Sequence, residues 1–126
     1  MDRVFCAIGA ASAGVAVALG AFGAHALRDR LGPQMLAIYE TGVRYQMYHA
    51  LGLLVVGLAI GRFAGAGDAT FLTTSGWLFV AGTVLFSGSL YILTLTGARW
   101  LGAVTPLGGV AFILGWACLL IGALKR

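Results

Sequence analysis

The sequence predicts an all-α membrane protein, an up-down bundle of four transmembrane helices with an interfacial amphipathic segment before the second helix. Of its 126 residues, 60% are hydrophobic and only 10% are charged, whereas about a quarter of the residues of a soluble domain are charged. The mean hydropathy is +0.97. The charged residues stand at the edges of long apolar runs, as they do in membrane proteins. These observations exclude water-soluble enzymes and nucleic-acid-binding proteins, although the net charge is +4.

The first predicted span covers residues 4–27, which include no Asp, Glu, Lys or Arg. A helix of about 20 apolar residues crosses the roughly 30 Å of hydrocarbon in a bilayer. This run is longer than the apolar region of about 7–15 residues in a secretory signal. We therefore expect it to be retained as a membrane span.

A short helix is predicted over residues 33–44, in the connection that follows the first span. Gly32 and Pro33 match an N-cap followed by proline at the first helical position. Apolar side chains then recur at helical spacing, which favours a helix lying partly in the membrane interface. These side chains are Leu36, Tyr39, Val43 and Met47.

Glu40 and Arg44 in this segment are four residues apart, in the order that favours an ion pair on a helix. The neighbouring Tyr45 and Tyr48 leave little polar surface around them. We therefore expect a buried pair, in which the loss of one partner would leave an uncompensated charge.

The other three spans are predicted over residues 45–61, 72–95 and 101–124. The connections between them are short, which favours antiparallel neighbours in an up-down bundle. We expect residues 1–126 to form a single integral membrane domain, with both termini on the same side of the membrane.

Small residues repeat along three of the spans at a spacing that lets helix backbones approach closely. This pattern favours tight packing within one chain, and an interface in a homo-oligomer is the alternative. The repeats are Ala10, Gly14 and Ala18 in the first span, Gly57 and Gly61 in the second, and Gly115 and Gly122 in the fourth.

Polar residues are concentrated where the first and third spans end and the second and fourth begin. In an up-down bundle these segments share one leaflet, and polar groups inside a membrane are costly unless they are satisfied. The sequence therefore predicts either a shared hydrogen-bonded cluster in this leaflet or a polar cavity that opens to one face and is a candidate for ligand binding. Its candidate residues are His25, Glu40, Arg44, Tyr45, Gln46, Tyr48, His49, Ser87 and Ser89.

His25 and His49 are expected to face one common polar cavity, beside Arg44, Tyr45 and Ser87. The main interpretation is that both imidazoles are hydrogen-bonded structural groups, and a proton or ligand role is the second. A bis-histidine haem or two-ligand copper site is a further alternative. Two histidines are too few for a closed zinc site, and we expect neither a metal nor a cofactor.

Four segments of the sequence match a known family. They are GAFGAHAL at residues 20–27, TGVRYQMYHALGLL at 41–54, FSGSLYIL at 86–93 and TPLGG at 105–109. The chain resembles domain of unknown function 423, the YgdD-like small multi-pass inner-membrane proteins. The resemblance implies a bacterial plasma-membrane protein with about four spans, and it brings no activity, substrate or catalytic residue to carry over.

No catalytic constellation is visible in the sequence, and we expect a non-enzymatic accessory protein that binds membrane lipid or a partner membrane protein. Arg44, Tyr45, Tyr48 and Trp100 suit an anionic lipid headgroup. The alternative is a homo-oligomeric transporter or channel for small molecules or ions. It is weakened because no span carries an Asp, Glu or Lys near its centre.

The membrane orientation is weakly specified, because Lys and Arg set it and they are evenly divided. The predicted topology divides the eight basic residues into two groups. Arg3, Arg62, Lys125 and Arg126 lie on the side of the termini, and Arg28, Arg30, Arg44 and Arg99 lie on the other.

Overall fold

The computed structural model describes residues 1–63, 65 and 67–125, and within them the chain forms four long helical segments and no strand. All four are long and apolar enough to cross a membrane, which confirms the predicted fold class. The segments are α1 (Asp2–Phe22) continued by η1 (Gly23–Leu27), then α2 (Pro33–Arg62), then α3 (Thr70–Gly82), η2 (Thr83–Ser87) and α4 (Gly88–Thr96), and finally η3 (Arg99–Ala103) with α5 (Thr105–Leu124).

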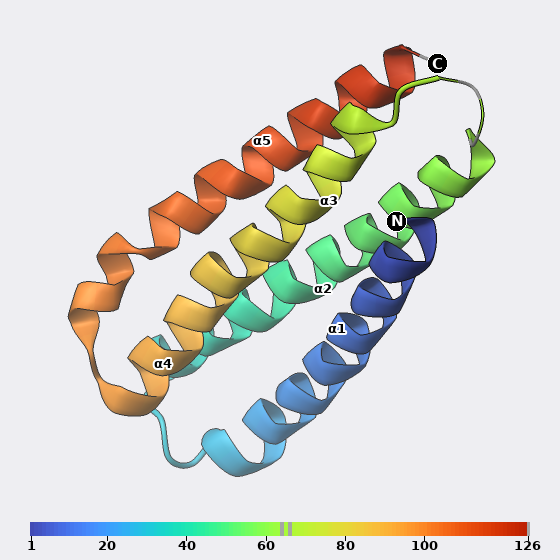
Figure 1. The fold of residues 1–126 in the computed structure, drawn as a ribbon. Helices are drawn as coiled ribbons and strands as arrows, with labels where there is room; N and C mark the ends of the chain where they lie inside the picture. The colour runs from blue at the N-terminus through green and yellow to red at the C-terminus, as the bar shows by residue number, and fades with distance from the viewer. Residues whose placement is uncertain (64, 66, 126) are drawn as a thin grey trace.

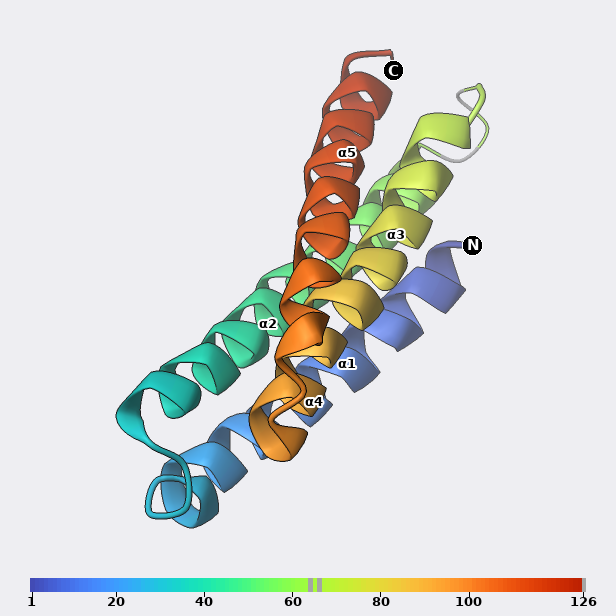
Figure 2. The same cartoon turned by 90° about the vertical axis from the view of Figure 1, so that its left-hand side faces the viewer.

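The four segments are arranged as two antiparallel pairs. α1 packs along α2, and α3 packs along α5. α2 joins the pairs, because it also contacts α3, η2 and α4. Figure 2 shows that α5 is inclined to α1 and α2, and Figure 1 shows both chain termini at the same end of the bundle.

α2 is one continuous helix, and it contains both the interfacial helix predicted over residues 33–44 and the span predicted over residues 45–61. Gly32 is the N-cap in an extended conformation and Pro33 occupies the first helical position, as expected. With 30 residues the helix is about 45 Å long, which exceeds the roughly 30 Å hydrocarbon thickness. His49 therefore lies near the middle of α2 rather than near its start.

Glycines on α5 receive large side chains from α3 and η2. A Cβ atom on Gly115 would lie 2.7 Å from the Phe79 ring, and one on Gly122 would lie 2.7 Å from Leu72. A Cβ atom on Gly108 would meet the backbone and Cβ of Phe86, so three residues seven apart on α3 and η2 face three glycines seven apart on α5. Gly115 and Gly122 thus pack within the chain, which is the first of the two interpretations of that repeat.

The other two repeats differ from each other. Gly57 packs against Cys6 of α1, so it also serves packing within the chain. A Cβ atom added to Gly14 would meet no other atom within 4 Å, and Gly14 lies on an exposed face of α1 with Ala10 and Ala18.

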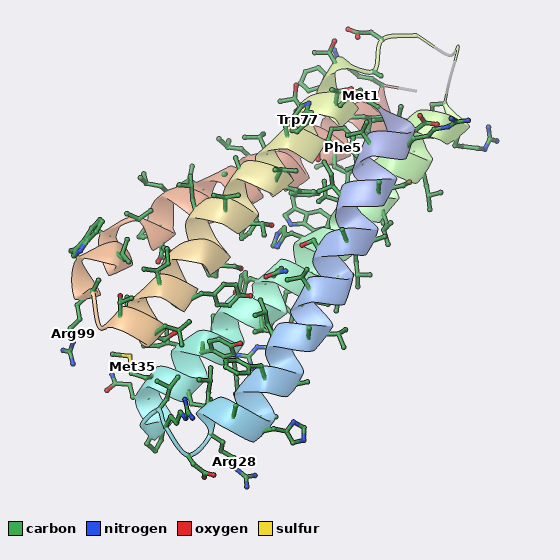
Figure 3. The ribbon with its side chains drawn as sticks, turned by 60° about the horizontal axis from the view of Figure 1, so that its bottom comes forward. Met1, Phe5, Arg28, Met35, Trp77 and Arg99 are labelled. Atoms are coloured by element: carbon green, nitrogen blue, oxygen red, sulfur yellow. The ribbon has the colours of Figure 1, made fainter. Side chains whose placement is uncertain are left out.

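Buried aromatic and aliphatic side chains fill the centre of the bundle: Phe5, Leu53, Val56, Phe79 and Phe112. Figure 3 shows Met1, Phe5 and Trp77 toward one end of the bundle, and Arg28, Met35 and Arg99 at the other. We call the second of these the Arg28 end. α4 stops there at Gly97, whose φ of 76° is the left-handed conformation that commonly ends helices.

Candidate functional site

A groove lies between α2, η2 and α5, and we call it the α2–α5 groove. Its volume is about 560 Å³, within the range of pockets that hold small organic ligands. Three of its side chains are well exposed, Tyr48 at 52%, Ile113 at 69% and Trp116 at 44%, so the groove opens on the outer surface of the bundle. The lining residues are Tyr45, Tyr48, His49, Phe86, Gly109, Phe112, Ile113 and Trp116.

His49 is the buried polar side chain of the groove, and both of its ring nitrogens are engaged. Trp116 Nε1 lies 3.0 Å from His49 Nε2. Since an indole N–H can only donate, Nε2 must accept and carries no proton. The proton is then on Nδ1, which donates to the carbonyl oxygen of Tyr45 at 2.7 Å. The hydrogen bonds therefore fix the tautomer of a neutral imidazole.

Aromatic rings cover the rest of the groove. The Phe112 ring stacks on the His49 imidazole with a centroid separation of 3.5 Å and an interplanar angle of 8°. Tyr45 stacks on Phe86 with centroids 4.6 Å apart. In the described part of the chain, the hydroxyls of Tyr45 and Tyr48 form no hydrogen bond with another protein group. They are therefore available to a ligand at the rim.

Arg44 stands beside the groove, one helical turn before Tyr48 on the exposed face of α2. Its Nη2 donates a hydrogen bond to Thr41 Oγ1 at 3.3 Å. Glu40 is also exposed, and across the residues that the structure describes the one ion pair joins the Met1 amino group to Asp2. The predicted buried Glu40–Arg44 pair is therefore wrong.

The reason is the rotational position of these residues on α2. The inward-facing positions are Tyr39, Gly42, Gln46 and His49, which recur every three or four residues and are all buried. Glu40 and Arg44 fall between these positions and point outward. Arg44 thus keeps its charge accessible.

Gln46 lies in the interior and connects three helices. Its Nε2 donates to the backbone carbonyl of Ser12 in α1 at 2.9 Å, and its Oε1 accepts from the Tyr91 hydroxyl of α4 at 2.6 Å. Tyr39 similarly donates its hydroxyl hydrogen to the carbonyl of Leu19 at 2.7 Å. These contacts satisfy Gln46 within the protein, so it is not available to a ligand.

Ser87 and Ser89 are buried on the same segment and make structural hydrogen bonds. Ser87 Oγ donates to the Gly42 carbonyl of α2 at 2.7 Å. Ser89 Oγ donates to the Phe86 carbonyl at 2.9 Å and lies 2.7 Å from Thr105 Oγ1 of α5. Both serines lie outside the groove lining, and they hold η2 and α4 in place around it.

His25 does not share a cavity with His49, so that expectation is wrong. His25 is exposed on η1, and its Nδ1 lies 2.8 Å from the Ala21 carbonyl oxygen. In the antiparallel α1–α2 pair, Ala50 lies against Gly9, which is 16 residues before His25. At 1.5 Å per residue the two histidines differ in depth by about 24 Å, which is too far to ligate one haem iron or copper ion.

The expectation failed because it places His49 near the start of a span, whereas His49 lies near the middle of a 30-residue helix. The other described side chains that could bind a metal ion do not form a cluster of ligands either. Within residues 1–63, 65 and 67–125, no three His, Cys, Asp or Glu side chains gather where they could hold a metal ion.

The groove residues of η2 and α5 are absent from the site predicted from the sequence. They are Phe86, Gly109, Phe112, Ile113 and Trp116. The four on α5 occur at positions i, i+3, i+4 and i+7, which share one helix face. This spacing is visible in the sequence, but it does not stand out because nearly every other residue of α5 is also apolar.

The family model described as "Protein of unknown function (DUF423)" matches residues 19–109 of this chain. The chain is similar to the UPF0382 membrane protein YwdK of Bacillus subtilis, with 52% identity over 98% of each protein. A UPF0382 membrane protein of Staphylococcus epidermidis is 50% identical over 98% of this chain and 97% of the relative. Protein SAB0533 of Staphylococcus aureus, with the same description, is 44% identical over the same shares. No solved structure gives a significant match.

Proposed function

Because the chain belongs to the DUF423 family of membrane proteins, whose description assigns no activity, we propose a function from the groove. The protein is a non-enzymatic accessory component that binds an anionic membrane lipid. The headgroup contacts Arg44 on α2, and one acyl chain enters the α2–α5 groove. The single observation that carries this proposal is the juxtaposition of an exposed, unpaired cation with an apolar groove that opens on the same face of α2.

The charge of Arg44 supports the headgroup contact. Its guanidinium is exposed, and among the described residues its one hydrogen bond to a side chain is the long contact to Thr41. Arg44 lies within the membrane-spanning part of α2, and a long arginine side chain there extends its charge toward the headgroup level. A cationic group at that level attracts anionic lipid by about 1 kcal/mol. The rim hydroxyls of Tyr45 and Tyr48 supply further donors for phosphate oxygens.

The lining of the groove supports the acyl-chain contact. Each lining side chain is aromatic or aliphatic except His49, whose nitrogens are already hydrogen-bonded. Arg44 precedes His49 by five residues, so the charge lies about 8 Å from the centre of the groove along α2. An acyl chain that extends from a headgroup at Arg44 toward the middle of the bilayer would follow α2 in this direction and reach the groove.

The bacterial relatives, which are named membrane proteins, support a location in a bacterial plasma membrane. The position of both termini at one end of the bundle (Figure 1) supports placing them on the same side. The alternative function, a homo-oligomeric transporter or channel, needs several copies, because side chains fill the centre of one bundle. Ion or solute flux in proteoliposomes would favour this alternative over lipid binding.

Lipid binding can be measured by native mass spectrometry of the protein taken from vesicles of equal phosphatidylglycerol and phosphatidylcholine. We expect the wild type to retain phosphatidylglycerol in preference to phosphatidylcholine. Arg44→Gln should reduce this preference about fivefold, which corresponds to about 1 kcal/mol. An unchanged preference in Arg44→Gln would refute the headgroup contact.

A groove-filling variant tests the acyl-chain contact. Gly109 lines the groove, and a Cβ atom there meets no other atom within 4 Å, so Gly109→Leu fills the groove without a clash at Cβ. The Gly109→Leu variant should retain neither phosphatidylglycerol nor phosphatidylcholine. Gly14→Leu is the matched control, because Gly14 has equal free space on the outer face of α1, and it should retain lipid as the wild type does.

A further inference from the structure

The hydrogen bond between Trp116 and His49 crosses the α2–α5 groove and is the polar contact inside it. Trp116 Nε1 donates and His49 Nε2 accepts at 3.0 Å. The His49 ring cannot turn freely, because Nδ1 is bonded to the Tyr45 carbonyl and Phe112 stacks on its face. The acceptor lone pair of Nε2 therefore stays directed toward α5.

Trp116 is the more exposed member of this pair. Its side chain is 44% exposed at the groove opening, and its ring rests against Phe79 with centroids 4.7 Å apart. A rotation of the indole toward the bilayer would separate Nε1 from Nε2. The bond would then be broken unless another group entered between them.

A hydroxyl group can enter this position without any loss of hydrogen bonds. It accepts from Trp116 Nε1 through its oxygen and donates its proton to His49 Nε2, because a hydroxyl is both donor and acceptor. An ether or a carbonyl can only accept, so it would leave Nε2 unsatisfied in an apolar site. Such an unsatisfied buried group is costly.

The shape and charge of the lining restrict the remainder of the ligand. None of the described residues that line the groove is an Asp, Glu, Lys or Arg, which favours a neutral ligand. Rings of Tyr45, Phe86 and Phe112 come from all three walls, and aromatic rings prefer to pack on one another in offset or edge-to-face arrangements. A flat ring therefore fits the lining better than a branched group.

We propose that the α2–α5 groove binds a neutral lipophilic phenol from the membrane interior, with its hydroxyl inserted between Trp116 and His49. The ring packs among Tyr45, Phe86 and Phe112, and any alkyl tail leaves through the opening beside Ile113. This inference shares the groove with the proposed function but does not use Arg44.

The test compares three probes with the same ring and tail: 4-nonylphenol, 4-nonylanisole and nonylbenzene. The anisole oxygen can only accept a hydrogen bond, and nonylbenzene can neither donate nor accept one. Binding is followed by Trp116 fluorescence in phosphatidylcholine nanodiscs, in a protein carrying Trp77→Phe and Trp100→Phe. We expect the phenol to bind about five- to tenfold more tightly than the other two, the usual effect of one hydrogen bond.

His49→Phe in the same background should abolish the advantage of the phenol over the anisole. The partition of each probe into the bilayer is the same for both proteins, so the change in this ratio reports the contact with His49. Should His49→Phe fail to fold, Gly109→Leu replaces it, and it should remove the binding of all three probes. Equal affinities in the Trp116 reporter protein, an advantage that survives in His49→Phe, or no binding of any probe would each overturn the inference.

The two proposals can fail separately. Phosphatidylcholine nanodiscs contain no anionic lipid, and Arg44→Gln should leave phenol binding unchanged. A wild-type protein that shows no preference for phosphatidylglycerol but binds the phenol selectively would refute only the lipid proposal. A wild-type protein that prefers phosphatidylglycerol but does not bind the phenol selectively would refute only the phenol proposal.

Discussion

Tyr91 of α4 donates its hydroxyl hydrogen to Oε1 of Gln46 on α2, with the two oxygens 2.6 Å apart. Through its amide nitrogen the same Gln46 reaches the Ser12 carbonyl of α1. One buried amide therefore ties together the two helix pairs. Gln46 is buried and Tyr91 is partly buried, so a polar group that loses its partner here is poorly compensated.

Removal of either partner should destabilise the protein. We expect Tyr91→Phe and Gln46→Leu each to lower the free energy of unfolding by about 1–3 kcal/mol, since each leaves a buried polar group unpaired. The double variant should lose less than the sum of the two. Tyr48→Phe is the control, because the Tyr48 hydroxyl is exposed and forms no hydrogen bond in the described chain. Thermal unfolding in detergent measures all four proteins, and strict additivity would contradict the direct bond.

The glycine contacts between α3–η2 and α5 should be sensitive to a single methyl group. In Gly108→Ala the new Cβ would overlap the backbone of Phe86. Rotation of a side chain cannot relieve an overlap with the backbone. We expect a loss of about 1–3 kcal/mol, typical of overpacking. Gly14→Ala adds the same methyl group in open space and should not destabilise α1, because alanine favours helix more than glycine. Equal melting temperatures for the two variants would contradict this packing.

Glu40 should contribute little to stability, because it is exposed and has no ion-pair partner in the described structure. Glu40→Gln should melt at the wild-type temperature in detergent, and so should Arg44→Gln. A clear loss of stability in both variants would instead indicate that the side chains pair in the membrane. Since Arg44→Gln is also the headgroup variant, an unchanged melting temperature shows that any effect on lipid binding is not caused by unfolding.

The fold was predictable because the bilayer imposes a length and an apolar composition on each helix. The sequence places a boundary between residues 44 and 45, where Glu40 and Arg44 interrupt the apolar run, and the helix continues through it. Outward-facing polar residues limit the part of a helix that lies in hydrocarbon without ending the helix, and their rotational position depends on which side of α2 packs against α1. Tyr39, Gly42 and Gln46 occupy that side, a fact of packing that hydropathy does not contain.

The candidate site was predictable only in part. The sequence indicates Tyr45, Tyr48 and His49 because polar groups are rare inside membrane spans, and these residues do line the groove. The sequence groups His25, Ser87 and Ser89 with them only because all are expected at the same depth in the membrane. That expected depth depends on where the second span begins. Phe112 and Trp116 were missed because an aromatic residue on an apolar helix does not show which face will be left uncovered.

The orientation in the membrane gives a final prediction. Arg3, Arg62, Lys125 and Arg126 lie on one side of the predicted topology, and Arg28, Arg30, Arg44 and Arg99 lie on the other. Figure 3 shows Arg28 and Arg99 together at one end of the bundle. With no bias in Lys and Arg between the two ends, charge gives no preferred orientation.

Two lysines added after Arg126 should therefore change the orientation measured with C-terminal reporter fusions, moving the C-terminus toward the cytoplasm. Two glutamates at the same place are the control and should have little effect, because acidic residues contribute little to orientation. If the fusions report one orientation that added lysines do not alter, charge balance does not decide topology. Residues at the Arg28 end that anchor the helices would then be the next to substitute. Trp100 in η3 is the first of these, because it is 71% exposed and tryptophan anchors helices at the membrane interface.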